Sequence, residues 1–174
     1  MKTALLWRHA KSAWGNPGLD DHERPLNRRG ERAAEVMAEY LVTHAPRPDL
    51  ILCSTAVRTR LTLAPLMQRL TAPAPPIALE KGLYLASEAS LLHRLQGLPD
   101  DVGTILLIGH NEGIGELAAA LPGKGRSGLL LAAREKFPTG ALAVMHASID
   151  RWNDLAEGSA ELIDFVKPKD LEPG

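Results

Sequence analysis

Short apolar runs alternate along this chain with longer stretches in which apolar residues recur every three or four positions. A short apolar run is typical of a strand buried on both faces, and the longer period is typical of an amphipathic helix. The runs predict six strands, at residues 4–7, 50–53, 77–79, 104–109, 140–149 and 161–166. The run at 104–109 has the clearest pattern, and the run at 77–79 has the weakest.

Helices are predicted between these strands. Asn27, Ser87 and Asn111 each precede a stretch of helical period, and their side chains can accept hydrogen bonds from the first turn of a helix. A further helix follows the strand at 50–53, where the apolar positions are Leu63, Leu66, Met67 and Leu70. The Gly-rich segment 122–140 contains several basic residues and shows no pattern that predicts one element.

The alternation of strands and helices predicts an α/β fold. Its continuous apolar strands favour a mostly parallel sheet with helices on both faces, that is, a three-layer α/β/α sandwich. No repeat, linker or low-complexity segment interrupts the pattern, so residues 1–174 are expected to form a single domain. In such folds ligands bind at the carboxyl ends of the strands.

Composition narrows the classes of partner and site. The formal net charge is −1, so the chain as a whole lacks the basic character expected for binding nucleic acid or an anionic membrane. Cys53 is the single cysteine, which excludes a disulfide framework or a cysteine zinc site within one chain. The apolar run at residues 4–7 is too short for a signal peptide or a membrane span, so a cytoplasmic protein is expected.

Cationic residues follow three of the predicted strands. Arg8 and His9 follow the first strand, Arg58 lies one helical turn after the second, and His110 comes directly after the strand at 104–109. Because the carboxyl ends of parallel strands meet at one edge of a sheet, these side chains can converge although they are far apart in sequence. Singly, each of them is equally compatible with a surface, ion-paired or buried structural role.

A convergence of two arginines and two histidines favours a phosphate site. The planar guanidinium group pairs bidentately with phosphate oxygens, and helix N-termini after the strands add N–H donors. Mutual repulsion among the cations would lower the histidine pKa values. A neutral imidazole is a nucleophile, so phosphoryl transfer to a histidine becomes possible.

Three motifs at these positions resemble the histidine phosphatase superfamily. They are "RHA" at 8–10, S-x-x-x-R-T-x-x-T at 54–62 and "GHN" at 109–111. "RHAKS" at 8–12 and "RPLNRRG" at 24–30 are similar to the SixA-like branch, the phosphohistidine phosphatases. The resemblance extends from residue 3 to about residue 167 and implies a phosphoglycerate mutase-like fold.

The resemblance also implies a role for each site residue. His9 is implied as the nucleophile that becomes phosphorylated, Arg8 and Arg58 as ligands of the phosphoryl oxygens, and His110 as a further donor. Arg24 corresponds to an additional phosphate-contacting arginine of the SixA-like branch. No metal and no cofactor are expected, because the cationic side chains supply the charge that a metal would supply.

The proton donor for the leaving group is less well defined. Glu80, after the third strand, is the best-placed candidate, and Asp20, Asp21 and Glu23 are weaker ones. A phosphohistidine substrate needs no such donor, because its imidazole leaving group can already be protonated. Glu112 follows "GHN" where relatives often have proline, and a carboxylate there would repel phosphate unless it points away.

The expected function is therefore a metal-independent phosphatase with a phosphohistidine intermediate, acting on phosphohistidine of a protein. A general phosphatase for small phosphoesters is the alternative within the same superfamily. A non-catalytic module that binds a phosphorylated partner is a second alternative. A metallohydrolase built from His9, His110 and an aspartate is a third, although no H-x-H or H-E-x-x-H spacing occurs.

Overall fold

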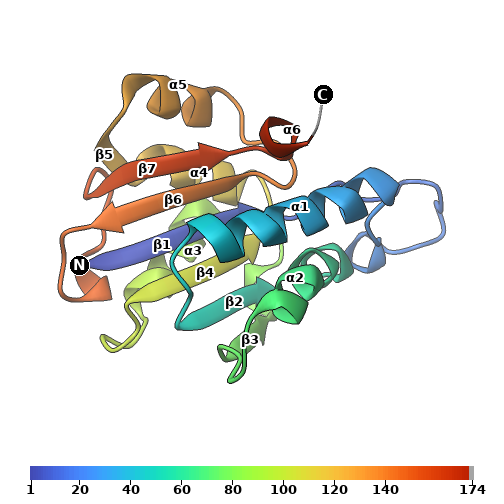
Figure 1. The fold of residues 1–174 in the computed structure, drawn as a ribbon, viewed down its shortest axis with the longest axis horizontal. Helices are drawn as coiled ribbons and strands as arrows, with labels where there is room; N and C mark the ends of the chain where they lie inside the picture. Colours follow the sequence, from blue (N-terminus) through green and yellow to red (C-terminus); the bar gives the residue numbers. More distant parts are fainter. Residues whose placement is uncertain (173–174) are drawn as a thin grey trace.

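A seven-stranded sheet forms the centre of the computed structural model, which describes residues 1–172 (Figure 1). The strand order is β3-β2-β4-β1-β6-β7-β5. The strands are β1 (Lys2–Arg8), β2 (Leu50–Ser54), β3 (Ile77–Glu80), β4 (Thr104–Gly109), β5 (Pro122–Gly125), β6 (Leu142–Ala147) and β7 (Ala160–Val166). Each predicted strand is present, and β5 is an additional one.

The sheet is mostly parallel, as predicted. β1, β4, β2 and β3 run in the same direction, and β5 is parallel to β7. β6 is antiparallel to both β1 and β7, and among the described strands it alone runs in the opposite direction. The carboxyl ends of β1, β2 and β4 consequently lie at one edge of the sheet.

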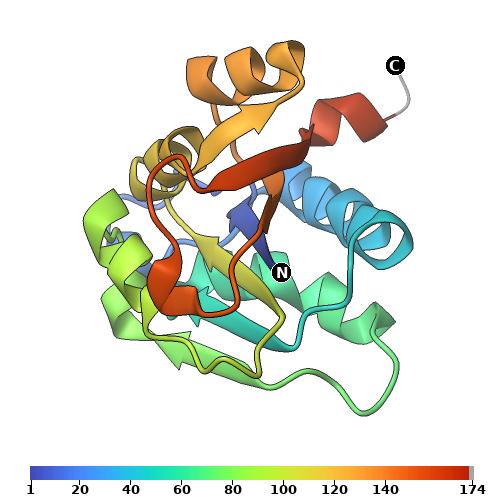
Figure 2. The same cartoon turned by 90° about the vertical axis from the view of Figure 1, so that its left-hand side faces the viewer.

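Helices cover both faces of the sheet, which confirms the three-layer architecture (Figure 2). α1 and α2 pack on one face, and α3 and α4 pack on the other. The helices are α1 (Arg28–His44), α2 (Val57–Arg69), α3 (Glu88–Gln96), α4 (Gly113–Ala120), α5 (Ser127–Glu135) and α6 (Pro168–Leu171), with short 3-10 turns at Asp21–Glu23, Lys81–Leu83 and Trp152–Asp154.

The alternation of side chains along β1 explains the two cores. Leu5 and Trp7 are fully buried against the α1–α2 layer, whereas Leu6 is fully buried in the core on the α3–α4 side. Successive side chains of a strand point to opposite faces, so a continuous apolar run supplies both cores at once. This burial holds β1 rigidly beside β4 and fixes where its last residue, Arg8, emerges.

The predicted caps at Asn27 and Ser87 are confirmed, whereas the N-cap residue of α4 is Glu112 and the predicted Asn111 lies one residue before it. The Asn27 side chain accepts a hydrogen bond of 2.8 Å from the Gly30 amide at the start of α1. Ser87 does the same at α3, and the Asn111 side chain accepts from the Gly115 amide at 3.0 Å in the first turn of α4.

Segment 122–140, which had no predicted element, forms β5 and α5. β5 has the sequence PGKG, without any apolar run, and exists because it pairs with β7 at the edge of the sheet. Strand pairing with a distant segment leaves no local signal in such a sequence. Within residues 1–172, none of the helices combines the length and the apolar character that crossing a membrane requires.

Candidate active site

The ends of β1 and β4 place two histidines side by side. Arg8 is level with Gly109 in the parallel ladder, and the His9 amide donates to the Gly109 carbonyl at 3.1 Å. His9 and His110 therefore leave adjacent strands at the same level, and their ring centroids are 5.3 Å apart. The predicted convergence of the strand ends is present in the structure.

The end of β2 adds a buried arginine. Arg58 lies in the first turn of α2 and is only 2% exposed. Together these segments surround a cavity of about 440 Å³, which we call the catalytic cavity. Its lining comprises Arg8, His9, Lys11, Ser12, Trp14, Asp21, Arg24, Arg58, Leu85, His110, Asn111 and Thr139.

Backbone contacts determine the tautomer of His9. Its Nδ1 lies 2.6 Å from the Ala10 carbonyl oxygen, which can only accept, so Nδ1 carries the proton. Nε2 then bears the lone pair, and no residue among 1–172 hydrogen-bonds to it. The Ala10 amide in turn donates to Thr62 Oγ1 at 2.9 Å, which anchors this turn to α2.

Gly140 contacts the same turn from the side opposite to α2. The Gly140 amide donates to the His9 carbonyl at 2.8 Å. Gly140 has a φ of 80°, a backbone conformation that residues with side chains rarely adopt. A Cβ there would also lie 2.7 Å from Pro168 Cγ, so the backbone conformation and this close contact both disfavour a side chain. The backbone that presents His9 is thus held from both α2 and the segment before β6.

Burial and neighbouring cations keep both histidines neutral. Burial, opposed by the hydrogen bond to Ala10 and assisted by the positive charges of Arg58, Arg8 and Arg24, lowers the pKa of His9 to about 4. Burial, followed by the charges of His9 and Arg58, lowers the pKa of His110 to about 3. At neutral pH the free Nε2 of His9 is therefore an unprotonated nucleophile.

Three buried nitrogen atoms of the site lack a hydrogen-bond partner within the described part of the chain. They are Arg8 Nε, Arg58 Nε and His110 Nδ1, and they account for all the unpartnered buried side-chain nitrogen and oxygen atoms found there. Arginine Nε always carries a proton, so at least two of these atoms are donors. Buried donors without acceptors are costly, and their concentration here favours an oxygen-rich anionic ligand.

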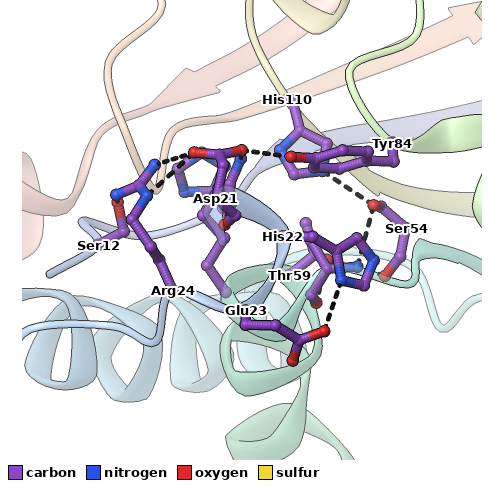
Figure 3. Close-up of polar contacts among 12 residues, drawn as sticks. Ser12, Asp21, His22, Glu23, Arg24, Ser54, Thr59, Tyr84 and His110 are labelled. Atoms are coloured by element: carbon purple, nitrogen blue, oxygen red, sulfur yellow. Dashed lines mark hydrogen bonds and ion pairs between the residues drawn. The ribbon is translucent and has the colours of Figure 1, made fainter. Parts of the chain in front are cut away.

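Asp21 forms ion pairs with Arg24 and Arg58, and Figure 3 shows its contacts with Arg24 and Tyr84. Its Oδ1 accepts from Arg24 Nε at 3.0 Å and Nη2 at 2.8 Å, and its Oδ2 accepts from Arg58 Nη2 at 3.0 Å. The Tyr84 hydroxyl donates to the same Oδ2. Hydrogen bonds from Tyr84, Arg24 and Arg58 hold the pKa of Asp21 well below its usual range, so this carboxylate is ionised and cannot serve as a proton donor.

Tyr84 has no predicted role, yet it contacts the centre of the site. Its ring packs edge-on against His110, with centroids 5.3 Å apart, and against His22 at 4.9 Å. Ser54, at the end of β2, lies 2.8 Å from His110 Nε2 through its hydroxyl oxygen. Ser54 belongs to a motif that the sequence does show, whereas a single tyrosine in a loop after β3 has no recognisable pattern.

The mouth of the catalytic cavity is formed by residues that follow β1. Lys11 and Ser12 line it, and the Ser12 hydroxyl accepts from Arg24 Nη1 at 2.6 Å. The Arg24 guanidinium also stacks on the Trp14 ring, 3.6 Å from its centroid, while that ring stays 76% exposed. Arg24 is therefore a buried, oriented residue of the site and not a solvated loop charge.

Glu80 is not brought to the catalytic cavity. It ends the edge strand β3, and both of its carboxylate oxygens accept from Arg94 of α3, at 2.8 and 2.9 Å. This bidentate ion pair places Glu80 outside the lining of the catalytic cavity, so the geometry gives no support to its expected role as general acid. Glu112 is exposed and lies outside the cavity lining, so it points away as the chemistry requires.

No group of three or more histidine, cysteine, aspartate or glutamate side chains within residues 1–172 is arranged as metal ligands would be. Cys53 is fully buried, and burial raises the pKa of its thiol to about 12. The chemistry of the cavity therefore centres on two imidazoles and three guanidinium groups.

Comparisons with known proteins agree with this geometry. A family model described as the histidine phosphatase superfamily (branch 1) matches residues 4–84. An uncharacterized protein of Mycobacterium tuberculosis, MT1313, is 36% identical over 164 residues, which cover 93% of this chain and 99% of the relative.

Solved structures give the same result. A candidate phosphohistidine phosphatase SixA from Nakamurella multipartitia is 31% identical, with a TM-score of 0.82 and 96% of each chain covered. A candidate SixA from Agrobacterium tumefaciens is 34% identical, with a TM-score of 0.78, covering 96% of this chain and 98% of that one. With a neutral histidine among arginines at the strand ends, these likenesses show that the chain belongs to the histidine phosphatase superfamily, as a SixA-like phosphatase.

Proposed function

We propose that this protein removes the phosphoryl group from phosphohistidine of a protein, without a metal, through a phosphohistidine intermediate on His9. The observation that carries the proposal is the state of His9. Its Nδ1 donates to the Ala10 carbonyl, its Nε2 is free, and its ring lines a cavity with three arginines. This combination supplies a neutral nucleophile next to cations that neutralise a phosphoryl group.

Substrate binding uses the N–H groups that the protein leaves unoccupied. Among the described residues, Arg8 donates through Nη1 to the Phe137 carbonyl at 2.9 Å, and its Nε has no partner there. Arg58 Nε and His110 Nδ1 are likewise without a partner within residues 1–172. Arg24 is held by Asp21 and Ser12 and adds positive charge at the mouth.

Catalysis proceeds in two displacements. In the first, the Nε2 lone pair of His9 forms a bond to phosphorus while the bond from phosphorus to the substrate imidazole breaks, and that imidazole leaves with the proton it already carried. In the second, a water oxygen bonds to phosphorus as the bond to Nε2 breaks. The proton lost by water goes to solvent or to the phosphate product, and His9 returns to its neutral form.

The proton requirement favours phosphohistidine over phosphoesters. An alkoxide leaving group needs a proton donor, but Asp21 is ionised and Glu80 is paired with Arg94 outside the cavity. A protonated imidazole leaves without further help. The relatives from Nakamurella multipartitia and Agrobacterium tumefaciens, which are described as candidate phosphohistidine phosphatases, support the same substrate class.

The test is phosphate release from a phosphohistidine peptide and from an aryl phosphate, both in the presence of EDTA. We expect wild-type protein to favour the peptide and His9→Ala to lose at least about 1,000-fold in rate. His93→Ala removes an exposed histidine on α3 and is the matched control.

Each other outcome identifies an alternative. A preference for the aryl phosphate would indicate a general phosphatase. Phosphate binding without turnover by folded wild-type protein would indicate a binding module, with Arg8 and Arg58 as its recognition site. Activity that EDTA abolishes and a metal restores would overturn the metal-independent mechanism.

A further inference from the structure

A second, larger cavity adjoins the catalytic cavity. Its volume is about 620 Å³, and it lies between the start of α1, the segment after α5, and α6. Figure 1 shows α6 next to α1, with α5 beyond it. Lys11 and Thr139 line both cavities, so the two lie side by side. We call this second cavity the cationic groove.

The groove carries an excess of positive charge. Its lining includes two carboxylates, Glu135 and Glu172, against five cations, namely Lys11, Arg29, Lys136, Lys167 and Lys169. Within residues 1–172, no ion pair joins any of these five cations to a carboxylate. The chain as a whole has a net charge of −1, so this concentration is a local feature and not a consequence of a basic protein.

The kind of cation distinguishes the groove from a small-anion site. In the catalytic cavity Arg24 and Arg58 are buried and oriented by hydrogen bonds. In the groove Lys11, Lys136 and Lys169 are exposed, and lysine is a flexible point charge without the fixed fork of arginine. Mobile, separated charges fit an extended acidic surface better than a single phosphate.

We propose that the cationic groove docks the acidic face of the protein that carries the phosphohistidine. The inference rests on the proposed function and adds the character of the partner. Because the groove shares Lys11 and Thr139 with the catalytic cavity and so lies beside it, an acidic surface held there would bring a neighbouring phosphohistidine close to His9. Binding energy would then come from outside the reacting group, where it improves capture of the substrate.

The experiment uses two phosphohistidine peptides of equal length. One has several glutamates beside the phosphohistidine, and the other has glutamines in their place; phosphoimidazole serves as the minimal substrate. In Lys136→Glu/Lys169→Glu we expect kcat/KM for the acidic peptide to fall roughly tenfold, through KM, with about unchanged values for the other two substrates. The wild-type preference for the acidic peptide should also shrink as salt is added.

Lys124→Glu is the matched control, because Lys124 is exposed on β5 and lies outside both cavities. Equal effects of the groove variant on the acidic and neutral peptides would overturn the docking proposal. A groove that binds inorganic tripolyphosphate tightly and does not discriminate the acidic peptide would also overturn it, because the ligand would then be a small polyanion.

Binding measured without turnover separates this proposal from the proposed function. The unphosphorylated acidic peptide, labelled with a fluorophore, should bind wild-type protein more tightly than Lys136→Glu/Lys169→Glu. If it does so while no phosphohistidine peptide is hydrolysed, the groove docks an acidic partner and the proposed function fails. If the peptides are hydrolysed without this difference in binding, the function stands and the docking proposal fails.

Discussion

The catalytic cavity and the cationic groove adjoin each other and are both positively charged, but they are built differently. Arg58, which lines the catalytic cavity, is 2% exposed and is fixed by the Asp21 side chain and backbone. Lys136 and Lys169 of the groove are exposed and enter no ion pair within residues 1–172. The catalytic cavity therefore holds positive charge at fixed positions, whereas the cationic groove only makes the local electrostatic potential more positive.

This difference explains where each cavity obtains its rigidity. The ends of β1, β2 and β4 are embedded in a sheet that is buried on both faces, so their side chains emerge at defined positions. The groove is formed by the start of α1, the segment after α5 and the four-residue helix α6, and its exposed Lys136 and Lys169 come from the last two. Transition-state stabilisation requires fixed donors, whereas attraction of a partner does not, so substitutions in the two cavities should differ greatly in effect.

The largest effect is expected for Arg58→Lys. The substitution keeps the charge but removes the fork that holds Asp21 at two atoms and the free Nε, so kcat/KM should fall roughly 100-fold or more. Arg60→Lys, in the same helix but exposed, is the matched control and should change little. Steady-state kinetics on the phosphohistidine peptide would measure both. A loss as small as the loss for a groove lysine would contradict the distinction between the two cavities.

Asp21→Asn should have a smaller effect, which we expect on two quantities: inhibition by phosphate and kcat. The amide keeps the shape of the carboxylate but removes a negative charge next to Arg24 and Arg58, so inorganic phosphate should inhibit about tenfold more strongly. Because the two arginines lose an ionic anchor, kcat should fall by roughly tenfold at the same time.

Glu80→Gln is the matched control for that experiment, since it makes the same change in a carboxylate that Arg94 holds outside the cavity. It should alter neither phosphate inhibition nor turnover of an aryl phosphate. A large loss of aryl phosphate turnover in Glu80→Gln would restore it as the general acid, and unchanged phosphate inhibition in Asp21→Asn would remove Asp21 from the phosphate site.

The same contrast explains what could be predicted from the sequence. His9 and His110 directly follow apolar runs that are unmistakably strands, so the rule for parallel strand ends locates them. Tyr84 and Asp21 form a hydrogen bond although they are 63 residues apart in sequence and lie in two different loops. No periodic pattern in the sequence connects them. Glu80, which the sequence placed near the site, ends β3, the strand with the weakest predicted pattern. An exposed edge strand does not determine where its last side chain points, so the position of Glu80 outside the catalytic cavity could not be predicted.

Segment 122–140 illustrates a second limit. β5 contains two glycines and no apolar run, and it is defined by hydrogen bonds to β7, about 35 residues further along the chain, so its conformation depends on tertiary structure. Much of the groove follows from this region, since Lys136 comes directly after α5 and α6 follows β7. The sequence shows that segment 122–140 is basic, which is compatible with a flank of the cleft for an acidic partner or with a solvated loop. It does not bring Lys136 together with the lysines near residues 11 and 167–169, so the groove as a whole could not be predicted.

The smallest effect, a dependence of stability on pH, tests the electrostatics of the catalytic cavity without any substrate. The folded-state pKa values of His9 and His110 are about 4 and about 3, below the ordinary value of 6.5. Between pH 6.5 and 4 the unfolded chain therefore binds protons that the folded chain does not bind. The free energy of unfolding should fall as the pH is lowered, with a limiting slope of about 1.4 kcal/mol per pH unit for each histidine.

Urea unfolding of wild-type protein and of His110→Gln between pH 7 and 5, in phosphate-free buffer, measures this slope. The variant should lose about half of the dependence, because one of the two shifted groups is gone. The control His93→Gln, on the exposed face of α3, should keep the full slope, since His93 lies outside the catalytic cavity and the substitution leaves His9 and His110 in place. Equal slopes in all three proteins would mean that His110 is not held neutral by burial and by the neighbouring His9 and Arg58. The effect of burial and of the arginines on the adjacent His9 would then also be smaller than the geometry of the catalytic cavity implies.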